Sequence, residues 1–263
     1  MEDLSYNKTK NPMILGRLSL VKLICFGKII DVGCGLGETF GENAVNLDLE
    51  PEMEKINLIK KMYPVDYERF LKKFPKLRIP NYVQADASEK IPFENKSFDC
   101  AVLSEVLEHV QMDKCISILK ECSRVADFVV ITVPNEWEWP SAVCFNRQVK
   151  NDISAHINFF NQKMLFDLVA KASLFVVYYL KVNLFAYSHH ILVVTNEPGL
   201  PVINVGGTEQ VIGLGVNGSC PDEIVSVITL KRLEQLKKEH NKLINIKRIS
   251  RQRGREAVIP SGP

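Results

Sequence analysis

Residues 28–37 read Lys-Ile-Ile-Asp-Val-Gly-Cys-Gly-Leu-Gly, and this stretch decides the fold. Its first five residues form a short apolar run with an acid, Asp31, near the end, which predicts a buried strand. Gly33, Gly35 and Gly37 follow, each separated by one residue. Glycines at this spacing allow a sharp turn and let backbone N–H groups approach a ligand without an intervening Cβ atom. We therefore expect Asp31 beside the crevice where open α/β sheets bind their ligands.

A strand followed by a glycine turn can serve a dinucleotide, a nucleotide phosphate or S-adenosylmethionine (SAM). The dinucleotide fingerprint is Gly-x-Gly-x-x-Gly. In this chain the third glycine comes one residue early, and an acid precedes the first glycine. An acid is a poor neighbour for a pyrophosphate but a good one for an ammonium group. The turn therefore favours SAM, and it resembles the first motif of class I SAM-dependent methyltransferases, Asp/Glu-x-Gly-x-Gly-x-Gly.

The rest of the chain continues an alternation of strands and helices. Apolar runs predict strands at 44–49, 82–85, 100–103 and 128–133, and a final antiparallel pair at 175–179 and 190–194. Helical patterns occupy 52–62, 66–74 and 114–124, with one more around residues 164–169. Strands that alternate with helices indicate a mostly parallel sheet covered on both faces.

Polar residues follow the predicted strands at regular places. Asp48 ends the second strand, Asp86 and Ala87 follow the third, and Ser104-Glu105-Val-Leu-Glu-His follows the fourth. This combination resembles the class I SAM-dependent methyltransferase family, in the branch of ubiquinone-biosynthesis-type O-methyltransferases, over about residues 27–196. The resemblance implies a Rossmann-like, doubly wound, mostly parallel seven-stranded sheet with an antiparallel last strand.

The resemblance also implies SAM as the cofactor and assigns its contacts residue by residue. The amino-acid part of SAM would be held by Asp31 and the turn of Gly33, Gly35 and Gly37. The ribose would be held by Asp48, the adenine by Asp86 and Ala87, and the sulfonium end would be lined by Ser104 and Glu105.

Methyl transfer is a displacement on a sulfonium, which needs alignment of the reactants and a base if the nucleophile is a hydroxyl. The candidate bases are His109 and His156. Four side chains could also form a divalent-metal cluster: Glu105, Glu108, His109 and His156. The first three are expected on one face of a helix, because residues i, i+3 and i+4 share a face. A similar Glu-x-x-Glu-His…His arrangement occurs in small-RNA 3′-terminal ribose methyltransferases. The other interpretation is that Glu-Val-Leu-Glu-His is a helix start whose side chains only cap and pack, so no metal ligand is assigned.

Composition indicates an ordinary globular chain of 263 residues, 46% hydrophobic and 24% charged. Seven cysteines at irregular spacing and the lack of a secretory leader predict a cytoplasmic protein with reduced thiols. Residues 231–255 hold ten Lys and Arg against two Glu. The predicted organisation is a helical lead-in at 1–26, a methyltransferase domain at 27–197, a Gly/Pro-rich linker at 198–221 and a basic helical tail at 222–263.

The linker contains a second glycine motif, at 213–218, that matches Gly-x-Gly-x-x-Gly. It lacks a following strand with a terminal acid, so we expect it to bind no ligand. The basic tail at 231–255 is either a solvated helix, a contact for nucleic acid or an anionic membrane, or a docking helix.

The expected function is methyl transfer from SAM to an oxygen or nitrogen of a small-molecule or sugar acceptor. One alternative is an RNA ribose 2′-O-methyltransferase with a metal-assisted site. The other is a SAM-binding module that regulates or scaffolds without catalysis. The chain has no Asn/Asp-Pro-Pro-Tyr/Phe motif after the fourth strand, which argues against exocyclic amines of bases as acceptors.

Overall fold

The computed structural model describes residues 21–137 apart from 23, 38, 63 and 136, residues 156–198 apart from 185–186, and the strand at 204–211. Three predictions lie outside the described residues: the lid up to residue 155, the second glycine motif and the basic helical tail. The same holds for the first twenty residues of the predicted lead-in. Its last part is described, and it forms a helical turn in which Cys25 N–H donates to the carbonyl of Val21.

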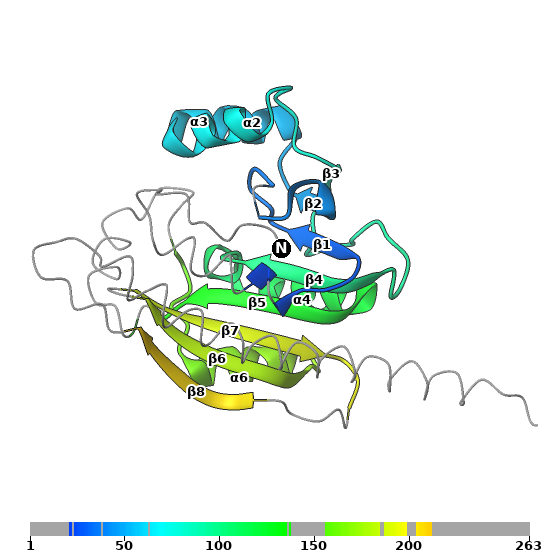
Figure 1. The fold of residues 1–263 in the computed structure, drawn as a ribbon. Helices are drawn as coiled ribbons and strands as arrows, with labels where there is room; N and C mark the ends of the chain where they lie inside the picture. Colours follow the sequence, from blue (N-terminus) through cyan, green and yellow to red (C-terminus); the bar gives the residue numbers. More distant parts are fainter. Residues whose placement is uncertain are drawn as a thin grey trace, which may run out of the picture.

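One mixed sheet organises the molecule (Figure 1). Its strands are β1 (Ile29–Val32), β2 (Ala44–Asp48), β3 (Tyr82–Gln84), β4 (Phe98–Ser104), β5 (Ala126–Pro134), β6 (Phe175–Leu184), β7 (Tyr187–Thr195) and β8 (Asn204–Val211). They lie in the order β3-β2-β1-β4-β5-β7-β6-β8. The chain leaves β1 towards β2 and β3 on one side and later returns to β4 and β5 on the other. The strand order therefore reverses between β1 and β4, and at the carboxyl ends of strands at such a switch point open α/β sheets form the crevice that binds their ligands.

The strand directions confirm the predicted fold. Strands β1 to β5 pair in parallel, whereas β7 runs antiparallel to both β5 and β6. Parallel strands buried on both faces consist of continuous apolar runs, and every residue of β1 is buried. The seven predicted strands are all present.

The eighth strand, β8, corrects the prediction that 198–221 is a linker throughout. Residues 204–211 pair in parallel with β6, and the register skips Gly206 between the Tyr179–Val205 and Leu180–Gly207 pairs. A glycine accommodates such a bulge readily. The glycines that suggested a linker are therefore compatible with an edge strand.

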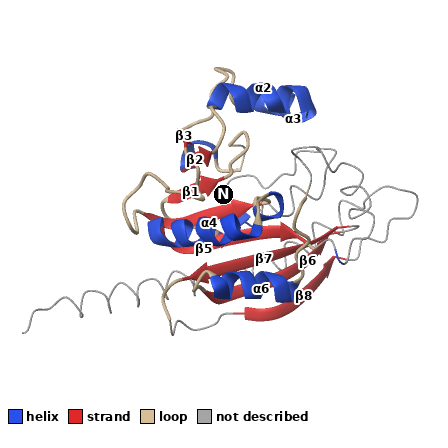
Figure 2. Ribbon diagram, turned by 180° about the vertical axis from the view of Figure 1, so that it is seen from behind, coloured by secondary structure: helices blue, strands red, loops and turns tan. Residues whose placement is uncertain are grey.

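Two helices cover one face of the sheet, as Figure 2 shows. Helix α4 (Met112–Val125) and helix α6 (Gln162–Lys171) bury apolar side chains that include Leu119 and Leu165. The opposite face is covered in part by the helical turn before β1, through Val21 and Ile24, and by Phe40. Each face of the sheet thus packs against its own apolar layer.

Helices α2 (Glu52–Met62) and α3 (Pro64–Lys73) form the predicted insertion between β2 and β3 (Figure 1). Proline suits the first turn of a helix, which explains why α3 begins at Pro64. Ile56 and Phe70 pack with Leu36 of the glycine turn, so the insertion is joined to the crevice.

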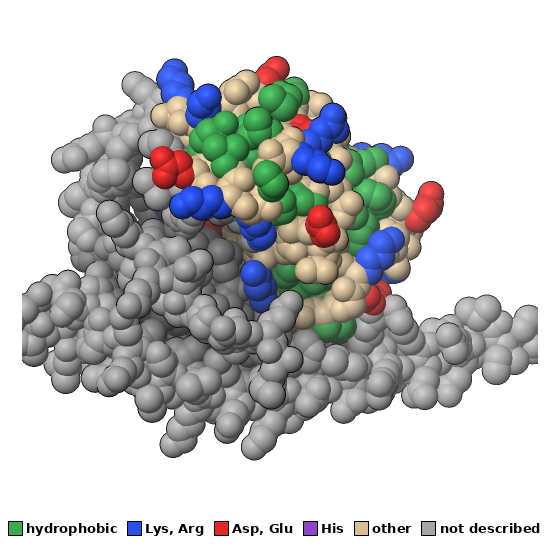
Figure 3. Space-filling model, turned by 45° about the horizontal axis from the view of Figure 1, so that its top comes forward, with side chains coloured by type: hydrophobic (Ala, Val, Ile, Leu, Met, Phe, Trp, Pro, Cys, Tyr) green, Lys and Arg blue, Asp and Glu red, His purple; other side chains and the backbone are tan. Residues whose placement is uncertain are grey.

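On the face in Figure 3, basic and acidic side chains are scattered among hydrophobic ones. Among the described helices, none has the length and apolar character needed to cross a bilayer.

Candidate active site at the carboxyl edge of the sheet

The glycine turn after β1 is held against β2 by backbone hydrogen bonds. The N–H groups of Gly33 and Cys34 donate to the carbonyl of Leu47, at 2.8 and 3.2 Å. Gly33 has φ of 70°, and a Cβ there would lie 2.6 Å from a methyl of Val106. Gly35 has φ of 59°, but a Cβ there would meet nothing within 4 Å. Gly33 is thus required by packing, whereas Gly35 leaves open space beside the backbone.

Asp31 is a buried carboxylate with an unsatisfied oxygen. Its side chain is 2% exposed, and Oδ2 has no hydrogen-bond partner among the described residues. Burial, together with the charge of Asp48, raises the pKa of Asp31 to about 7. A buried carboxylate without a donor is costly, so this position is suited to a cationic ligand group.

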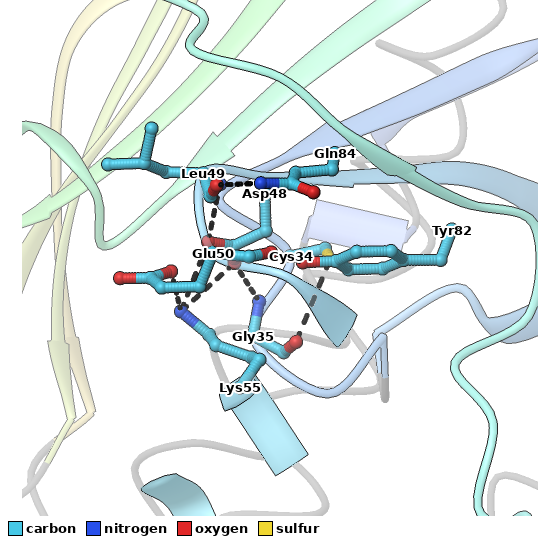
Figure 4. A network of polar contacts seen from close by, with 8 residues as sticks. All are labelled: Cys34, Gly35, Asp48, Leu49, Glu50, Lys55, Tyr82 and Gln84. Atoms are coloured by element: carbon cyan, nitrogen blue, oxygen red, sulfur yellow. Dashed lines mark hydrogen bonds and ion pairs between the residues drawn. The ribbon is translucent and has the colours of Figure 1, made fainter. Parts of the chain in front are cut away.

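Asp48 lies at the end of β2 in the polar network shown in Figure 4. Gly35 N–H donates to its Oδ2 at 3.2 Å, which ties the glycine turn to β2. Lys55 Nζ, from α2, lies 3.1 Å from Asp48 and 3.1 Å from Glu50. Burial raises the pKa of Asp48 to about 6, with Lys55 opposing the shift. Burial alone would lower the pKa of Lys55, but the charges of Asp48 and Glu50 outweigh it and raise that pKa.

Asp86 and Ala87 follow β3, as predicted, and their side chains differ in environment. Asp86 Oδ1 accepts hydrogen bonds from the N–H and hydroxyl of Ser88, at 2.8 and 2.6 Å. These bonds lower the pKa of Asp86. Its other oxygen lies 4.0 Å from Lys114 Nζ. Ala87 is buried in the core, so its methyl group packs beneath this turn.

Ser104 and Glu105 stand at the end of β4. Glu105 has φ of 57°, a left-handed conformation that is strained for a residue with a side chain. Thr132 Oγ1 donates to Glu105 Oε1 at 3.0 Å, and His189 Nε2 lies 3.2 Å from Oε2. The hydroxyls of Ser104 and Thr132 are 3.2 Å apart.

The predicted helix containing Glu105, Glu108 and His109 is not formed. Only Leu107–His109 is helical, as a single 3₁₀ turn named η2, and Glu105 lies outside it. The hypothesis that these three share one helix face is therefore wrong. The cause is the left-handed backbone at Glu105, which ends β4 abruptly and sends the side chain towards β5 and β7.

Three members of the predicted cluster are nevertheless brought together. Potential ligand atoms of Glu108, His109 and His156 lie within 4.8 Å of one another. The imidazole rings pack edge to face with centroids 4.7 Å apart, and Glu108 is fully buried. Asn158 fixes the two segments, because its side-chain amide donates to the carbonyls of Leu107 and Val110 at 2.8 and 2.6 Å. Two imidazoles and a carboxylate are a donor set that divalent metals accept.

Three residues of this edge were missed by the sequence analysis: Lys55, Thr132 and His189. Lys55 lies seven residues after Asp48, so an exposed-looking helical lysine reaches back to the strand end. Thr132 and His189 lie far from Glu105 in the sequence. The one available signal was the pair His189–His190 at the head of an otherwise apolar strand.

A separate hollow of about 720 Å³ lies before β4 begins, between the 90–95 loop and Arg124. Arg124 there is bonded to Glu121 and to loop carbonyls. This hollow is at the opposite end of β4 from Glu105, and its Arg124 side chain is already paired.

Part of the described core is similar to known proteins. Residues 30–127 match the protein family described as "Methyltransferase domain". The uncharacterized protein MJ1252 of Methanocaldococcus jannaschii is 31% identical over 135 residues, which are 50% of this chain and 47% of that protein. The chain thus spans about half the length of the curated relative it matches.

Solved structures of similar shape include a SAM-dependent methyltransferase of Thermotoga maritima, described as a possible histamine N-methyltransferase. It is 17% identical, with a TM-score of 0.49, over 70% of this chain and 88% of that one. A SAM-dependent methyltransferase of Methanosarcina mazei is also 17% identical, with a TM-score of 0.46, over 66% and 95% of the two chains.

Proposed function

We propose that this chain, whose residues 30–127 match the family described as "Methyltransferase domain", is a class I SAM-dependent methyltransferase that transfers a methyl group from SAM to an oxygen or nitrogen of a small-molecule acceptor. One observation carries the proposal. Asp31 keeps a buried carboxylate oxygen without a partner among the described residues, next to a glycine turn whose Gly35 leaves open space. The ammonium of the amino-acid part of SAM is the cation that this oxygen fits.

The other cofactor contacts follow from the strand ends. Asp48 would accept hydrogen bonds from the ribose hydroxyls, since the carboxylate already stands against Gly35 N–H at the end of β2. Asp86 and Ala87 would border the adenine. Ser104 and Glu105 would face the sulfonium, because β4 is the neighbour of β1 and ends at the same edge.

The reaction would be a direct displacement. An oxygen or nitrogen lone pair of the acceptor attacks the methyl carbon, the bond from carbon to sulfur breaks, and S-adenosylhomocysteine (SAH) leaves. The chain's residues would contribute alignment of acceptor and cofactor and exclusion of water, together with removal of the acceptor's proton. His109 and His156 remain candidates for that proton transfer.

A divalent metal fits the residues present, although none is assigned. Glu108, His109 and His156 would hold it, because their potential ligand atoms lie within 4.8 Å of one another. A bound divalent ion would lower the pKa of an acceptor hydroxyl. Glu105, the fourth member of the predicted set, is instead paired with His189 and Thr132.

A small-molecule acceptor is proposed ahead of RNA for one reason. The four-residue cluster of the RNA alternative is not assembled as predicted, since Glu105 is bonded to Thr132 and His189 instead. We propose cytoplasmic residence on the basis of the reduced cysteines and the small-molecule chemistry.

Calorimetric titration tests the cofactor assignment, with SAM and SAH as ligands and Asp31→Asn as the matched variant. The wild-type protein should bind both, and the variant should lose at least about tenfold in affinity for each. A screen with radiolabelled SAM over sugar, phenol, amine and RNA pools then identifies the acceptor. Absence of SAH and SAM binding to the wild-type protein would refute the proposal.

A further inference from the structure

Glu105 is held more firmly than a side chain lining a crevice needs to be. Its carboxylate takes a hydrogen bond at each oxygen, from Thr132 Oγ1 at 3.0 Å and from His189 Nε2 at 3.2 Å. Its own N–H donates to the carbonyl of Thr132 at 3.0 Å. Both partners are buried, whereas the Glu105 side chain is 19% exposed. Main chain and side chain are therefore both fixed, and the side chain is partly exposed.

The two bonds are those that an ionised carboxylate makes. Such a carboxylate only accepts hydrogen bonds, so beside it His189 Nε2 carries the proton and donates it. Thr132 donates to Glu105, so its oxygen accepts from the hydroxyl of Ser104. His189 Nδ1 is buried and has no partner among the described residues. This chain of donors stabilises a negative charge at Glu105.

The position of this carboxylate relates it to the cofactor. Residue 105 directly precedes Val106, which packs against Gly33 of the glycine turn. The strained φ of 57° places Glu105 at the point where β4 ends beside β1. Strain that is held in place by surrounding bonds is typical of functional positions.

On the basis of the function proposed above, we propose that Glu105 is the catalytic base of methyl transfer and that His189 is its positioning residue. The acceptor's O–H or N–H would give its proton to the carboxylate of Glu105 as its lone pair forms the bond to the methyl carbon. The bond between that carbon and sulfur breaks, and its electron pair stays on the sulfur of SAH. The positive charge of the sulfonium is lost, and Glu105 ends as a neutral carboxylic acid.

A binding experiment tests this without knowledge of the acceptor. Sinefungin carries an amino group, protonated at neutral pH, where SAM carries the transferable methyl, whereas SAH carries nothing there. A carboxylate facing that point should make sinefungin bind more tightly than SAH by about tenfold to a hundredfold. Calorimetry with both ligands measures this ratio in the wild-type protein, Glu105→Gln, His189→Gln and His190→Gln.

We expect the ratio to fall to about one in Glu105→Gln, with SAH affinity retained, and to fall by a smaller factor in His189→Gln. His190→Gln is the matched control, because His190 is equally buried on the same strand but bonds Tyr179 instead. Its ratio should equal that of the wild type. Thermal stabilisation by SAH shows that each variant is folded.

The inference is overturned if wild-type protein binds sinefungin and SAH equally, or if Glu105→Gln leaves the ratio unchanged. It is also overturned for His189 if the control variant lowers the ratio as much as His189→Gln does. Binding of neither ligand to the wild type would instead refute the proposed function itself, so the two failures are distinct.

Discussion

Replacing Asp31 with asparagine should stabilise the ligand-free protein and weaken cofactor binding by at least about tenfold. Asp31 is buried, and its pKa of about 7 lies far above the ordinary 3.8 because burial opposes its charge. The folded protein therefore binds this proton more tightly than the unfolded chain does. Between these two pKa values, stability falls as pH rises, and the full cost is present above pH 7. Asparagine keeps the shape without the charge.

The magnitude follows from the two pKa values. The difference between about 7 and 3.8 corresponds to about 4 kcal/mol at pH 8. At pH 5 the folded protein is already protonated, and about 3 kcal/mol of this cost is relieved. The variant should thus exceed the wild type in free energy of unfolding at pH 8, and the gap should narrow by about 3 kcal/mol at pH 5.

Urea unfolding of both proteins from pH 5 to 8, with and without SAH, measures these quantities. Other carboxylates cancel in the difference between the two proteins. Wild-type protein should gain about 2.7 kcal/mol at a SAH concentration a hundred times its Kd, and the variant, with affinity at least about tenfold weaker, about 1.4 kcal/mol or less. A variant that is less stable than wild type at pH 8 by a gap independent of pH would refute the buried-charge argument. Undiminished SAH binding by the variant would refute the ammonium assignment.

Three further perturbations test the site. Gly33→Ala should lower the free energy of unfolding in urea by about 2 to 4 kcal/mol, because its Cβ would lie 2.6 Å from Val106. Gly35→Ala should lower it by only about 1 kcal/mol, yet weaken SAH binding in calorimetry. Equal losses of stability in the two variants would contradict this. Lys55→Gln removes the cation that opposes the raised pKa of Asp48, so the pKa of Asp48 should rise further in the variant. As pH falls from 8 to 5, SAH affinity should therefore decline at a higher pH than in wild type. An unshifted pH profile of SAH affinity would show that Lys55 does not act through Asp48. Mn²⁺ or Co²⁺ should raise the melting temperature of the wild type by a few degrees but not that of His156→Ala, and no shift in the wild type would leave the three residues with a packing role only.

The sequence predicted the nucleotide-binding half of the fold because its signals are local. The spacing of Gly33, Gly35 and Gly37 follows directly on the apolar run of β1, and Asp48 ends the next such run. In parallel strands these ends must meet at one edge. Helix α3 was predicted to begin after Pro64 but starts at it, since proline needs no hydrogen-bond partner in the first turn.

The other half of the site could not be predicted, because it depends on contacts between distant residues. Glu105 and His189 are 84 residues apart and meet only through the order β4-β5-β7. A helical pattern placed Glu105 on a face with Glu108, but one left-handed residue, which no pattern signals, separated them. Strand β8 was missed because Gly206 and Gly207 look like linker residues until β6 supplies a bulged partner.

Asp31 and Glu105 differ in the hydrogen-bond donors around their carboxylates, and this difference favours separate roles for them. Asp31 lacks a donor at one oxygen, so its charge is destabilised until a cation binds. Relief of this destabilisation by the ammonium group would contribute to the affinity for the cofactor. Glu105 has donors at both oxygens and a partly exposed side chain, so its charge is stabilised without a ligand. Substitution at Asp31 should therefore act on SAH and sinefungin alike, whereas substitution at Glu105 should act on sinefungin alone.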